Sequence, residues 1–457
     1  MYKKNQRIHF VGIGGIGMSG IAELLLNLNY RVSGSDLRGS TILDRLKGLG
    51  GQVVVGHRAG NVQGADVVVV SSAVRPDNPE VLAARSQSIP VIPRAEMLAE
   101  LMRMKYGIAV AGSHGKTTTT SLISTVLAHG NLDPTMVIGG RLNSLGTNAK
   151  LGRGEFLVAE ADESDGSFLF LTPTVAVVTN IDPEHLDYYQ DMQNLTEAFA
   201  QFLNKVPFYG LDVICLDHPV VRSLLPRVRK RVTTYGLSRQ ADFRGEEVHR
   251  EGWEICFRIY HREEEWGQVR LKIPGIHNVT NALAAVAVGN ELGLDFEVIR
   301  EGLEKFDGIH RRFERKGEAR GVLVVDDYGH HPAEIRATLE AALTGNRKRI
   351  LAAFQPHRYT RTQLCFDEFL GAFHNADLLV VTDIYAAGEK ELAGVHARKL
   401  VDGIRKEGHK DVHYVPSFAD IVSLLMERCQ PGDMVLTLGA GDIYRVGEML
   451  LDALNRA

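Results

Sequence analysis

The feature that most constrains the fold is a regular alternation of short apolar runs and helical segments along the chain. In the first hundred residues, each apolar run is short and is followed by a segment with helical spacing. Runs this apolar suit parallel strands that helices cover on both faces of a sheet. The predicted strands here are RIHFVGI (7–13), RVSGSD (31–36), QVVVG (52–56), DVVVVSS (66–72) and PVIP (90–93).

The length and the recurrence of this pattern predict the domain organisation. At roughly 150 residues per domain, 457 residues suggest about three domains. The alternation resumes at residue 106 and again after residue 321. Residues 241–273 instead alternate with period two, which predicts an antiparallel stretch. We therefore predict an α/β protein of three domains, the second with a small antiparallel β stretch, at residues 1–105, 106–311 and 312–457.

Composition and charge exclude several classes of protein. The formal net charge of −4 argues against a chain-wide surface for nucleic acid or anionic membranes. The four cysteines lie far apart in sequence, which fits a reducing, cytoplasmic setting. No apolar stretch reaches the ~18 residues of a membrane span, and glycines interrupt the apolar run near the N-terminus. We expect no signal peptide and no membrane insertion.

A first glycine-rich turn follows the first predicted strand and precedes a helix. Gly12, Gly14 and Gly17 fit the pattern G-x-G-x-x-G, with Gly15 between them, and Asp36 ends the next strand. Glycines let the backbone approach a diphosphate at a helix N-terminus, where free N–H groups await it. Asp36 would then bind ribose hydroxyls. The alternative is a tight packing turn without a ligand, and a nicotinamide cofactor does not follow because any nucleoside diphosphate fits.

A second glycine-rich turn carries a stronger signal. Backbone N–H groups there can cradle phosphates, Lys116 can reach the β- and γ-oxygens, and Thr117 can hold Mg²⁺. The turn departs from the full Walker spacing, because Val110 stands where that template has glycine. A strand before and a helix after still favour a phosphate loop over a purely structural turn. The loop comprises Gly112, Ser113, His114, Gly115, Lys116, Thr117 and Thr118.

Two further predicted strands end in acidic residues and a histidine. Glu163 follows one strand and His185 the other, and carboxyl ends of parallel strands line the same crevice as a phosphate loop. Mg²⁺ prefers oxygen ligands, so Glu163 is a natural metal ligand and His185 a second candidate. Taken alone, His185 could equally be a loop histidine that makes structural hydrogen bonds.

The last third of the chain holds a polar break and two strand ends dense in ionisable groups. The break, residues 308–321, contains Arg311 and Arg312, which suit either a solvated linker or an arginine placed on ATP phosphates. The strand ends are DDYGHHP (326–332) and QPHRYTRT (355–362). Their arginines suit carboxylate or phosphate, because planar guanidinium donors match both groups bidentately.

Together these motifs resemble the Mur ligase family, the ATP-dependent amino-acid ligases of peptidoglycan synthesis. The resemblance rests on GSHGKTTTT, DESD, NIDPEHLD, HNVTNALAA, HRRFE and DDYGHHP in family order, and it spans essentially the whole chain. The opening GIGGIGMSG and the later FQPHRYTRT look specifically like members that attach L-alanine to UDP-N-acetylmuramate. The resemblance implies a Rossmann-like first domain for the UDP part, a P-loop-type ATPase domain, and a Rossmann-like third domain for the amino acid.

The resemblance also implies roles for particular residues. UDP-N-acetylmuramate, L-alanine and ATP would bind together with Mg²⁺ or Mn²⁺, in a monomer or weak homodimer. Implied contacts to ATP are those of the phosphate loop together with His277, Asn278, Asn281, Arg312 and Asp326. Implied contacts to the sugar nucleotide, the amino acid and the nascent product are Gly12, Gly14, Gly15, Gly17, Asp36, Ser71, Ser72, Tyr328, His330, Arg358 and Arg361. Implied metal ligands are Thr117, Glu163 and His185.

The implied reaction begins with phosphorylation of a carboxylate, since a carboxylate is a poor electrophile. The lactyl carboxylate would attack the γ-phosphorus, and the neutral amine of L-alanine would then attack the acyl phosphate. Lys116, Mg²⁺ and Arg312 would offset charge on the transferring oxygens, and Glu163 would take part through the metal. His330 or His185 is the candidate base for the amine. Because water would hydrolyse the acyl phosphate, domain closure should precede chemistry.

One departure and three alternative functions stay open. Several relatives carry a modified lysine about fifteen residues after the motif histidine, but here the first lysine is Lys205. The way in which a second Mg²⁺ would be held is therefore open. The alternatives are a dehydrogenase, a nucleotide-gated binding protein, and the recycling ligase that attaches a whole tripeptide to the same sugar nucleotide.

Overall fold

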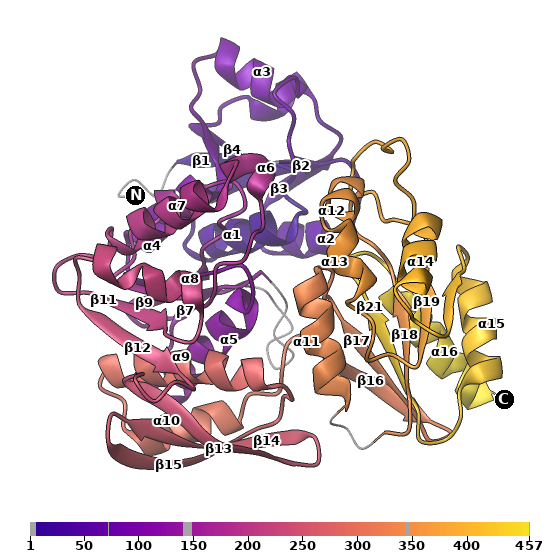
Figure 1. The fold of residues 1–457 in the computed structure, drawn as a ribbon. Coiled ribbons are helices and arrows are strands. Elements are labelled where there is room, and N and C mark those ends of the chain that lie inside the picture. Colours follow the sequence, from indigo (N-terminus) through magenta and orange to yellow (C-terminus); the bar gives the residue numbers. More distant parts are fainter. Residues whose placement is uncertain (1–5, 72, 140–148, 344–346, 457) are drawn as a thin grey trace. The chain divides into compact units, whose positions relative to one another are not determined.

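The computed structural model describes residues 6–71, 73–139, 149–343 and 347–456. These residues form three β-sheets flanked by helices, as drawn in Figure 1. By its internal contacts the chain divides into two compact units. The first unit comprises Met1–Glu247, Phe257–Val269 and Thr280–Phe306. The second comprises Val248–Cys256, Arg270–Val279 and Asp307–Ala457.

The first sheet is parallel throughout, with the strand order β3-β2-β1-β4-β5. Phe10 of β1 packs in one buried cluster with Leu24 of α1, whereas Val11 packs in another with Ala84 of α3. Helices therefore cover both faces, as the apolar runs predict. The strands are β1 (Arg7–Val11), β2 (Arg31–Asp36), β3 (Gln52–Val55), β4 (Val67–Val70) and β5 (Val91–Pro93), and the helices are α1 (Ile16–Asn27), α2 (Thr41–Gly48), η1 (Ala59–Val62), α3 (Pro79–Ser86) and α4 (Arg94–Met102).

The second sheet has the order β15-β14-β13-β12-β11-β10-β6-β9-β7-β8. Its strands β12, β11, β10, β6, β9 and β7 pair in parallel, and β8 joins β7 in antiparallel register. Its strands are β6 (Tyr106–Ala111), β7 (Thr135–Val137), β8 (Ala149–Lys150), β9 (Phe156–Glu160), β10 (Val175–Val178), β11 (Leu211–Cys215), β12 (Val232–Gly236), β13 (Phe243–Glu251), β14 (Glu254–His261) and β15 (Glu264–Leu271). Its helices are α5 (Lys116–His129), η2 (Ser167–Phe170), α6 (Leu186–Tyr189), α7 (Met192–Leu203), α8 (Pro219–Ser223), η3 (Leu225–Arg227), α9 (Ile276–Glu291) and α10 (Phe296–Glu304).

The third sheet has the order β16-β17-β21-β18-β19-β20, antiparallel only between β16 and β17. Alternate residues of β17 face opposite sides: Leu323 packs with α11 and α14, and Val324 packs with α15 and α16. Its strands are β16 (Glu314–Ala319), β17 (Val322–Asp327), β18 (Ile350–Phe354), β19 (Leu378–Val381), β20 (Val412–Tyr414) and β21 (Met434–Leu438). Its helices are α11 (Pro332–Leu343), α12 (Tyr359–Leu364), α13 (Phe366–Leu370), α14 (Ala397–Lys406), α15 (Phe418–Arg428) and α16 (Tyr444–Arg456).

The observed elements confirm the predicted α/β class and correct one detail. Residues 308–321 were expected to form a polar break, but they contain the charged strand β16, which pairs with β17 and has a register shift between Arg315 and Gly317. Charged side chains suit β16 because it lies at the edge of the sheet, where one side of the strand stays in water. Within the described residues, no helix is long and apolar enough to cross a membrane.

Candidate functional site

The second glycine-rich turn joins β6 to α5 in a backbone shape that requires its glycines. Gly112 has φ 141° and Gly115 has φ 81°, and residues other than glycine rarely adopt such positive φ angles. A Cβ atom on Gly112 would also lie 2.1 Å from Oγ1 of Thr179. Helix α5 begins at Lys116, directly after the turn, so its unpaired N–H groups face the concave side of the loop. This arrangement is the one expected of an anion-binding loop.

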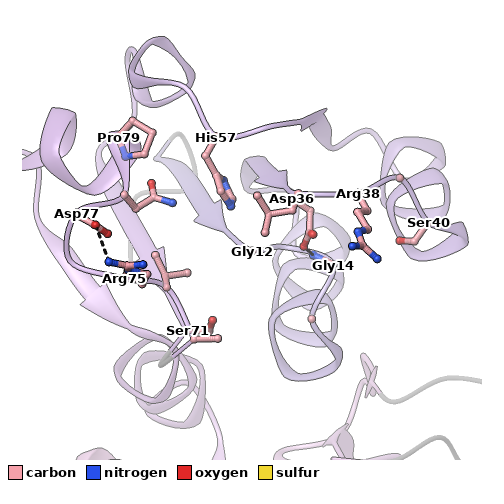
Figure 2. A pocket seen from close by; sticks show the side chains of 16 residues that line it. Gly12, Gly14, Asp36, Arg38, Ser40, His57, Ser71, Arg75, Asp77 and Pro79 are labelled. Carbon is pink, nitrogen blue, oxygen red and sulfur yellow. Dashed lines mark hydrogen bonds and ion pairs between the residues drawn. The ribbon is translucent and has the colours of Figure 1, made fainter. Parts of the chain in front are cut away.

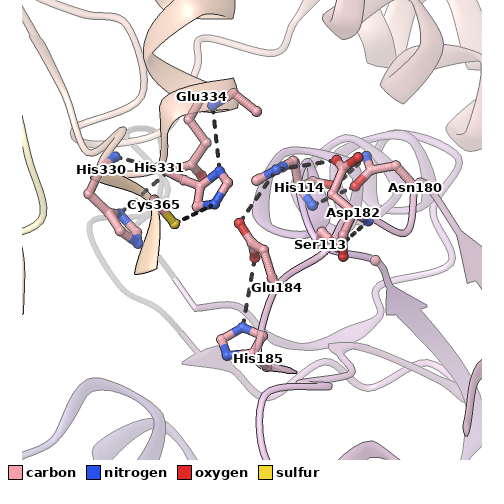
Figure 3. A network of polar contacts seen from close by, with 12 residues as sticks. Ser113, His114, Asn180, Asp182, Glu184, His185, His330, His331, Glu334 and Cys365 are labelled. Atoms are coloured by element: carbon pink, nitrogen blue, oxygen red, sulfur yellow. Dashed lines mark hydrogen bonds and ion pairs between the residues drawn. The ribbon is translucent and has the colours of Figure 1, made fainter. Parts of the chain in front are cut away.

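The end of β10 holds this loop in place. The backbone N–H of His114 donates to Oδ1 of Asn180 at 2.7 Å, and Thr179 Oγ1 donates to the carbonyl of His114 at 2.6 Å. The backbone N–H of Asp182 donates to Oγ of Ser113 at 2.8 Å. Nε2 of His114 lies 3.4 Å from Asp182 and 3.5 Å from Glu184, as Figure 3 illustrates. The loop is thus fixed by hydrogen bonds that involve no ligand.

Lys116 and Glu163 meet beneath the loop. Nζ of Lys116 lies 2.9 Å from Oε1 of Glu163 and also donates to the carbonyl of Ser113 at 3.1 Å. Glu163 is 1% exposed, and its second oxygen, Oε2, has no hydrogen-bond partner within the described structure. Burial raises the pKa of Glu163 to about 7, even with the Lys116 ammonium beside it. An additional cation beside Glu163 would stabilise its ionised form, which burial disfavours.

Glu163, Glu184 and His185 form a group that could hold a metal ion. Each offers one ligand atom, and these atoms lie within 4.8 Å of one another. His185, in a left-handed conformation at φ 57°, is the residue directly before α6, and its Nε2 lies 3.7 Å from Glu163. The buried Oε2 of Glu163, which has no hydrogen-bond partner in the described structure, could be satisfied by a cation. The two carboxylates supply the oxygen ligands that Mg²⁺ prefers. Sequence reasoning missed Glu184, although it directly precedes His185 in the motif.

Three of the implied contacts to ATP, namely His277, Asn278 and Asn281, lie at the start of α9. Asn281 accepts a hydrogen bond from Thr119 Oγ1 at 3.1 Å, and its side chain packs where a Cβ on Gly115 would point. Asn281 therefore contacts the phosphate-loop segment directly. In the second unit, Asn278 donates to the carbonyl of Pro274 at 2.6 Å, and His277 is exposed.

The first glycine-rich turn lines a cavity of about 720 Å³ in the first sheet's domain. Figure 2 shows this cavity between the ends of β1, β2 and β4. Of the residues implied to contact the sugar nucleotide, it brings together Gly12, Gly14, Gly15, Asp36 and Ser71. Gly17 instead packs beside Arg94, and Ser72 lies outside the described residues.

Asp36 has a structural role in this cavity. Its Oδ2 accepts a hydrogen bond from the backbone N–H of Gly14 at 2.8 Å, which ties β2 to the turn. Sequence reasoning missed the basic residues that line the same cavity, namely Arg38, His57 and Arg75. Each follows a strand or lies in a loop, and no spacing rule singles such residues out.

The loop after β17 carries Tyr328 and His330 in the second unit. The Nδ1 of His330 lies 3.0 Å from the carbonyl of Tyr328, so Nδ1 donates and the neutral ring keeps an acceptor at Nε2. Burial lowers the pKa of His330 to about 3, and Arg361 and His357 act in the same direction. His330 is thus neutral at ordinary pH and is a weak base. It suits hydrogen bonding to an amine better than removal of its proton.

The segment after β18 places arginines beside this loop. Arg358, at φ 69°, begins α12, and Arg361 Nη1 lies 3.2 Å from Nδ1 of His357. The rings of His357 and His330 lie 5.5 Å apart. Burial lowers the pKa of His357 to about 4, with Arg361 and Arg358 adding to the effect. Arg358 and Arg361 give this cluster its positive charge even when His357 is neutral. The cluster therefore suits an anionic group such as a carboxylate.

Arg311 and Arg312, both in the second unit, differ in their exposure and in their hydrogen-bond partners. Nε of Arg311 donates to Asp326 at 2.9 Å, and its terminal nitrogens donate to the carbonyls of Gly441 and Gly439. Its side chain is only 12% exposed, so the solvated-linker interpretation is wrong for Arg311. Arg312 is 31% exposed and lies 3.3 Å from Glu334, which also accepts from the backbone of His330 (Figure 3). Asp326 is fully buried, and its carboxylate accepts hydrogen bonds from Arg311 and from Thr437 Oγ1.

Comparisons with known proteins identify the family. Residues 7–106 match the model of the Mur ligase family catalytic domain, 110–289 the Mur ligase middle domain and 311–441 the Mur ligase glutamate ligase domain. The chain is 59% identical to UDP-N-acetylmuramate–L-alanine ligase of Geobacter sp. (strain M21), covering 100% of this chain and 99% of that protein. It is 58% identical to the ligase of the same name from Geotalea uraniireducens, with the same coverage.

Solved structures agree with the sequence comparison. The crystal structure of UDP-N-acetylmuramate-alanine ligase from Thermotoga maritima matches with a TM-score of 0.84 and 30% identity over 99% of this chain and 100% of that one. A murein peptide ligase from Psychrobacter arcticus matches with a TM-score of 0.74 at 23% identity, over 99% of this chain and 99% of that one, which is a likeness of fold. With three matched domains and full-length relatives of this similarity, the chain belongs to the Mur ligase family, and it has that family's three-domain α/β fold.

Proposed function

We propose that this chain ligates L-alanine to the lactyl carboxylate of UDP-N-acetylmuramate with ATP, giving UDP-N-acetylmuramoyl-L-alanine, ADP and phosphate. The observation that carries the proposal is the 59% identity, over the whole chain, to a relative named for this reaction. The chemistry of the described residues supports it, because the chain offers a phosphate loop, a cavity lined by the first glycine-rich turn, and an arginine cluster.

The phosphate loop and Lys116 are proposed to bind the phosphates of ATP. In the present structure Lys116 is paired with Glu163 and with carbonyls of its own loop, so its charge already lies at the loop. Thr117, Glu163 and His185 are proposed to hold Mg²⁺, with Glu184 as a further ligand. When bound, the metal offsets negative charge on the phosphate oxygens. The carboxylates of Glu163 and Glu184 also suit Mn²⁺.

The second unit is proposed to bind the amino acid. Arg358 and Arg361 would hold its carboxylate, because planar guanidinium groups match a carboxylate bidentately. Tyr328 and His330 would line the same site, with Nε2 of His330 accepting from the amine. Arg312 is the more exposed of the two neighbouring arginines and is proposed to reach ATP phosphates.

In the first unit, the turn from Gly12 to Gly17 is proposed to bind the diphosphate of UDP-N-acetylmuramate. The cavity there has about 720 Å³, which is enough for a nucleotide. We also propose that residues 1–105, 106–311 and 312–457 are the domains for sugar nucleotide, ATP and amino acid. The segment that replaces the relatives' modified lysine, 197–201, lies within α7, where Ala198, Phe199 and Ala200 are buried.

The decisive experiment is phosphate release with MgATP and UDP-N-acetylmuramate in parallel reactions. Separate reactions receive L-alanine, glycine, D-glutamate or the tripeptide L-Ala-γ-D-Glu-meso-diaminopimelate. Release that needs both the sugar nucleotide and L-alanine supports the proposal. Release with the tripeptide alone would assign the chain to recycling, and release without any sugar nucleotide would support a nucleotide-gated binding protein.

A further inference from the structure

A buried carboxylate lies beneath the nucleotide cavity and has no part in the function proposed above. Glu80, in the first turn of α3, is 0% exposed. One of its oxygens, Oε2, accepts from Ser35 Oγ at 2.5 Å and lies 3.5 Å from both His9 Nε2 and His57 Nδ1. The other, Oε1, accepts from the backbone N–H of Arg58 at 3.2 Å and from the Asn61 amide. Every one of these neighbours can act as a donor.

This set of donors keeps Glu80 ionised. Burial alone would raise the pKa of Glu80, but hydrogen bonds from His9, Ser35, Asn61 and the backbone of Arg58 outweigh it and lower the pKa to about 2. An ionised carboxylate can only accept hydrogen bonds. The hydroxyl of Ser35 must therefore point its single hydrogen at Glu80.

The orientation of that hydroxyl decides where His57 carries its proton. Ser35 Oγ also lies 2.8 Å from Nδ1 of His57. With its hydrogen already directed at Glu80, Ser35 can only accept in this second contact. Nδ1 of His57 must therefore be the donor. The other neighbour of Nδ1, Oε2 of Glu80, is an acceptor too, which favours the same tautomer.

The chosen tautomer fixes what His57 offers to the cavity. His57 lines the cavity and reaches into it in Figure 2, and its side chain is 13% exposed. A neutral imidazole with hydrogen on Nδ1 has a lone pair on Nε2. We propose that Glu80 and Ser35 are positioning residues that hold His57 as the Nδ1–H tautomer, so that Nε2 accepts a hydrogen bond from an N–H or O–H of the sugar nucleotide. This inference rests on the proposed function, and uridine offers both kinds of donor, the imide N–H and the ribose hydroxyls.

Two neighbouring serines of β2 provide a matched pair of variants. Ser35 bonds Glu80 and His57, whereas Ser33 bonds Nδ1 of His9 at 2.9 Å and does not line the cavity. Ser35→Ala removes the nearer of the two acceptors beside Nδ1 of His57, and Ser33→Ala removes a comparable hydroxyl–imidazole contact. Isothermal titration of UDP into the full chain should give a dissociation constant about tenfold higher for Ser35→Ala, and within about twofold of wild type for Ser33→Ala. Equal effects of the two substitutions would overturn the proposal.

The tautomer itself can be read without any ligand. Long-range ¹H–¹⁵N correlation spectra of histidine-labelled protein distinguish the two neutral tautomers, and the absence of a signal in His57→Gln assigns His57. Wild type should show Nδ1–H, and an Nε2–H signal for wild type would overturn the proposal. If wild type binds neither UDP nor UDP-N-acetylmuramate, the proposed function fails while this spectrum still tests the tautomer.

Glu80→Gln gives a second and sharper test. The backbone N–H of Arg58 cannot rotate away, so the new amide must keep its oxygen towards Arg58 and turn its NH₂ towards Ser35. Ser35 then accepts from the amide and donates to Nδ1 of His57, which reverses the tautomer to Nε2–H. Persistence of Nδ1–H in this variant would overturn the proposal. With 3-methyl-UDP, disappearance of the Ser35→Ala effect assigns the donor to the imide, and its persistence assigns a ribose hydroxyl.

Discussion

Lys116 and Glu163 form an ion pair of 2.9 Å in which the Glu163 side chain is 1% exposed and the Lys116 side chain is 18% exposed. Removing one partner leaves the other charge without its counter-charge, which costs more than removing both. We expect Lys116→Met to lower kcat by about 10²–10³-fold, because a phosphate-binding charge is lost. A double-mutant cycle of Lys116→Met with Glu163→Gln should give a coupling free energy of about 1–3 kcal/mol in urea denaturation. The exposed pair Lys150–Asp133 serves as control and should couple by less than about 0.5 kcal/mol.

Gly112 should tolerate no side chain. Gly112→Ala places a Cβ 2.1 Å from Thr179 Oγ1 at φ 141°, so the loop must move. We expect the dissociation constant for ATP to rise more than about tenfold, because the N–H groups of the loop lose their alignment. Gly371→Ala is the control, since its Cβ would meet nothing closer than 3.6 Å. Equal ATP affinities in the two variants would contradict the role assigned to the loop.

Asp212 in β11 should make the protein less stable as pH rises. Both of its oxygens are buried without a hydrogen-bond partner within the described structure, and burial raises its pKa to about 8. A carboxyl whose pKa is higher in the folded than in the unfolded protein stabilises fully below the unfolded value, near 3.9, and progressively less up to the folded value. The stability of wild type relative to Asp212→Asn should therefore fall between about pH 4 and pH 8.

We expect Asp212→Asn to be more stable than wild type by about 2–4 kcal/mol at pH 8, measured by urea denaturation. The difference should shrink towards pH 4 and level off below it, where the wild-type carboxyl becomes protonated in both states. Asp44→Asn is the control, because Asp44 is exposed on α2. A stability difference independent of pH would contradict this account.

Arg361 should matter for the amino acid and not for ATP. Arg361→Ala removes a guanidinium from the cluster with His357 and His330, and we expect the KM for L-alanine to rise about 10–100-fold with the KM for ATP unchanged. Arg361→Lys should recover little, since an ammonium cannot form the bidentate geometry. Arg398→Ala is the matched control in the same unit, where the guanidinium stacks on Tyr414. A parallel rise in both KM values would argue for a general structural defect.

Arg311 should contribute mainly to stability. Arg311→Met leaves the buried Asp326 without its arginine, and we expect a loss of about 3 kcal/mol in the free energy of unfolding. Arg315→Met, four residues along the chain and exposed, should change stability by less than about 0.5 kcal/mol. Comparable losses in the two variants would contradict the role of the Arg311–Asp326 pair.

Sequence alone could locate both glycine-rich turns, because the signal there is local. Strand, glycines and helix follow one another within a few residues, and the loop's need for positive φ restricts the choice of residue. Most of the apolar strands of the parallel sheets were predictable for the same reason, but β11 and β12 were not predicted. Strands β7 and β8 were missed because two or three residues carry no period, and β16 was missed because its charges suit an edge strand as well as a loop.

Contacts that join distant parts of the chain were beyond the reach of sequence. His9 and Glu80 are 71 residues apart, and the pairing exists because α3 packs against the sheet that contains β1. Arg311 and Arg312 are adjacent and chemically identical, yet Arg311 is largely buried against Asp326 and Arg312 is partly exposed. Only the folded backbone separates such neighbours, so charge and spacing left both interpretations open.

The bonds from the end of β10 to the phosphate loop also bear on inhibition. Because Thr179, Asn180 and Asp182 hold the loop in shape without a ligand, a small anionic inhibitor would meet donors that are already aligned. Such a compound would not have to order the protein on binding, so rigid fragments should retain high affinity per atom. Substitutions that loosen Asn180 would then weaken rigid inhibitors more than the flexible triphosphate, which makes this strand end a place to look for resistance.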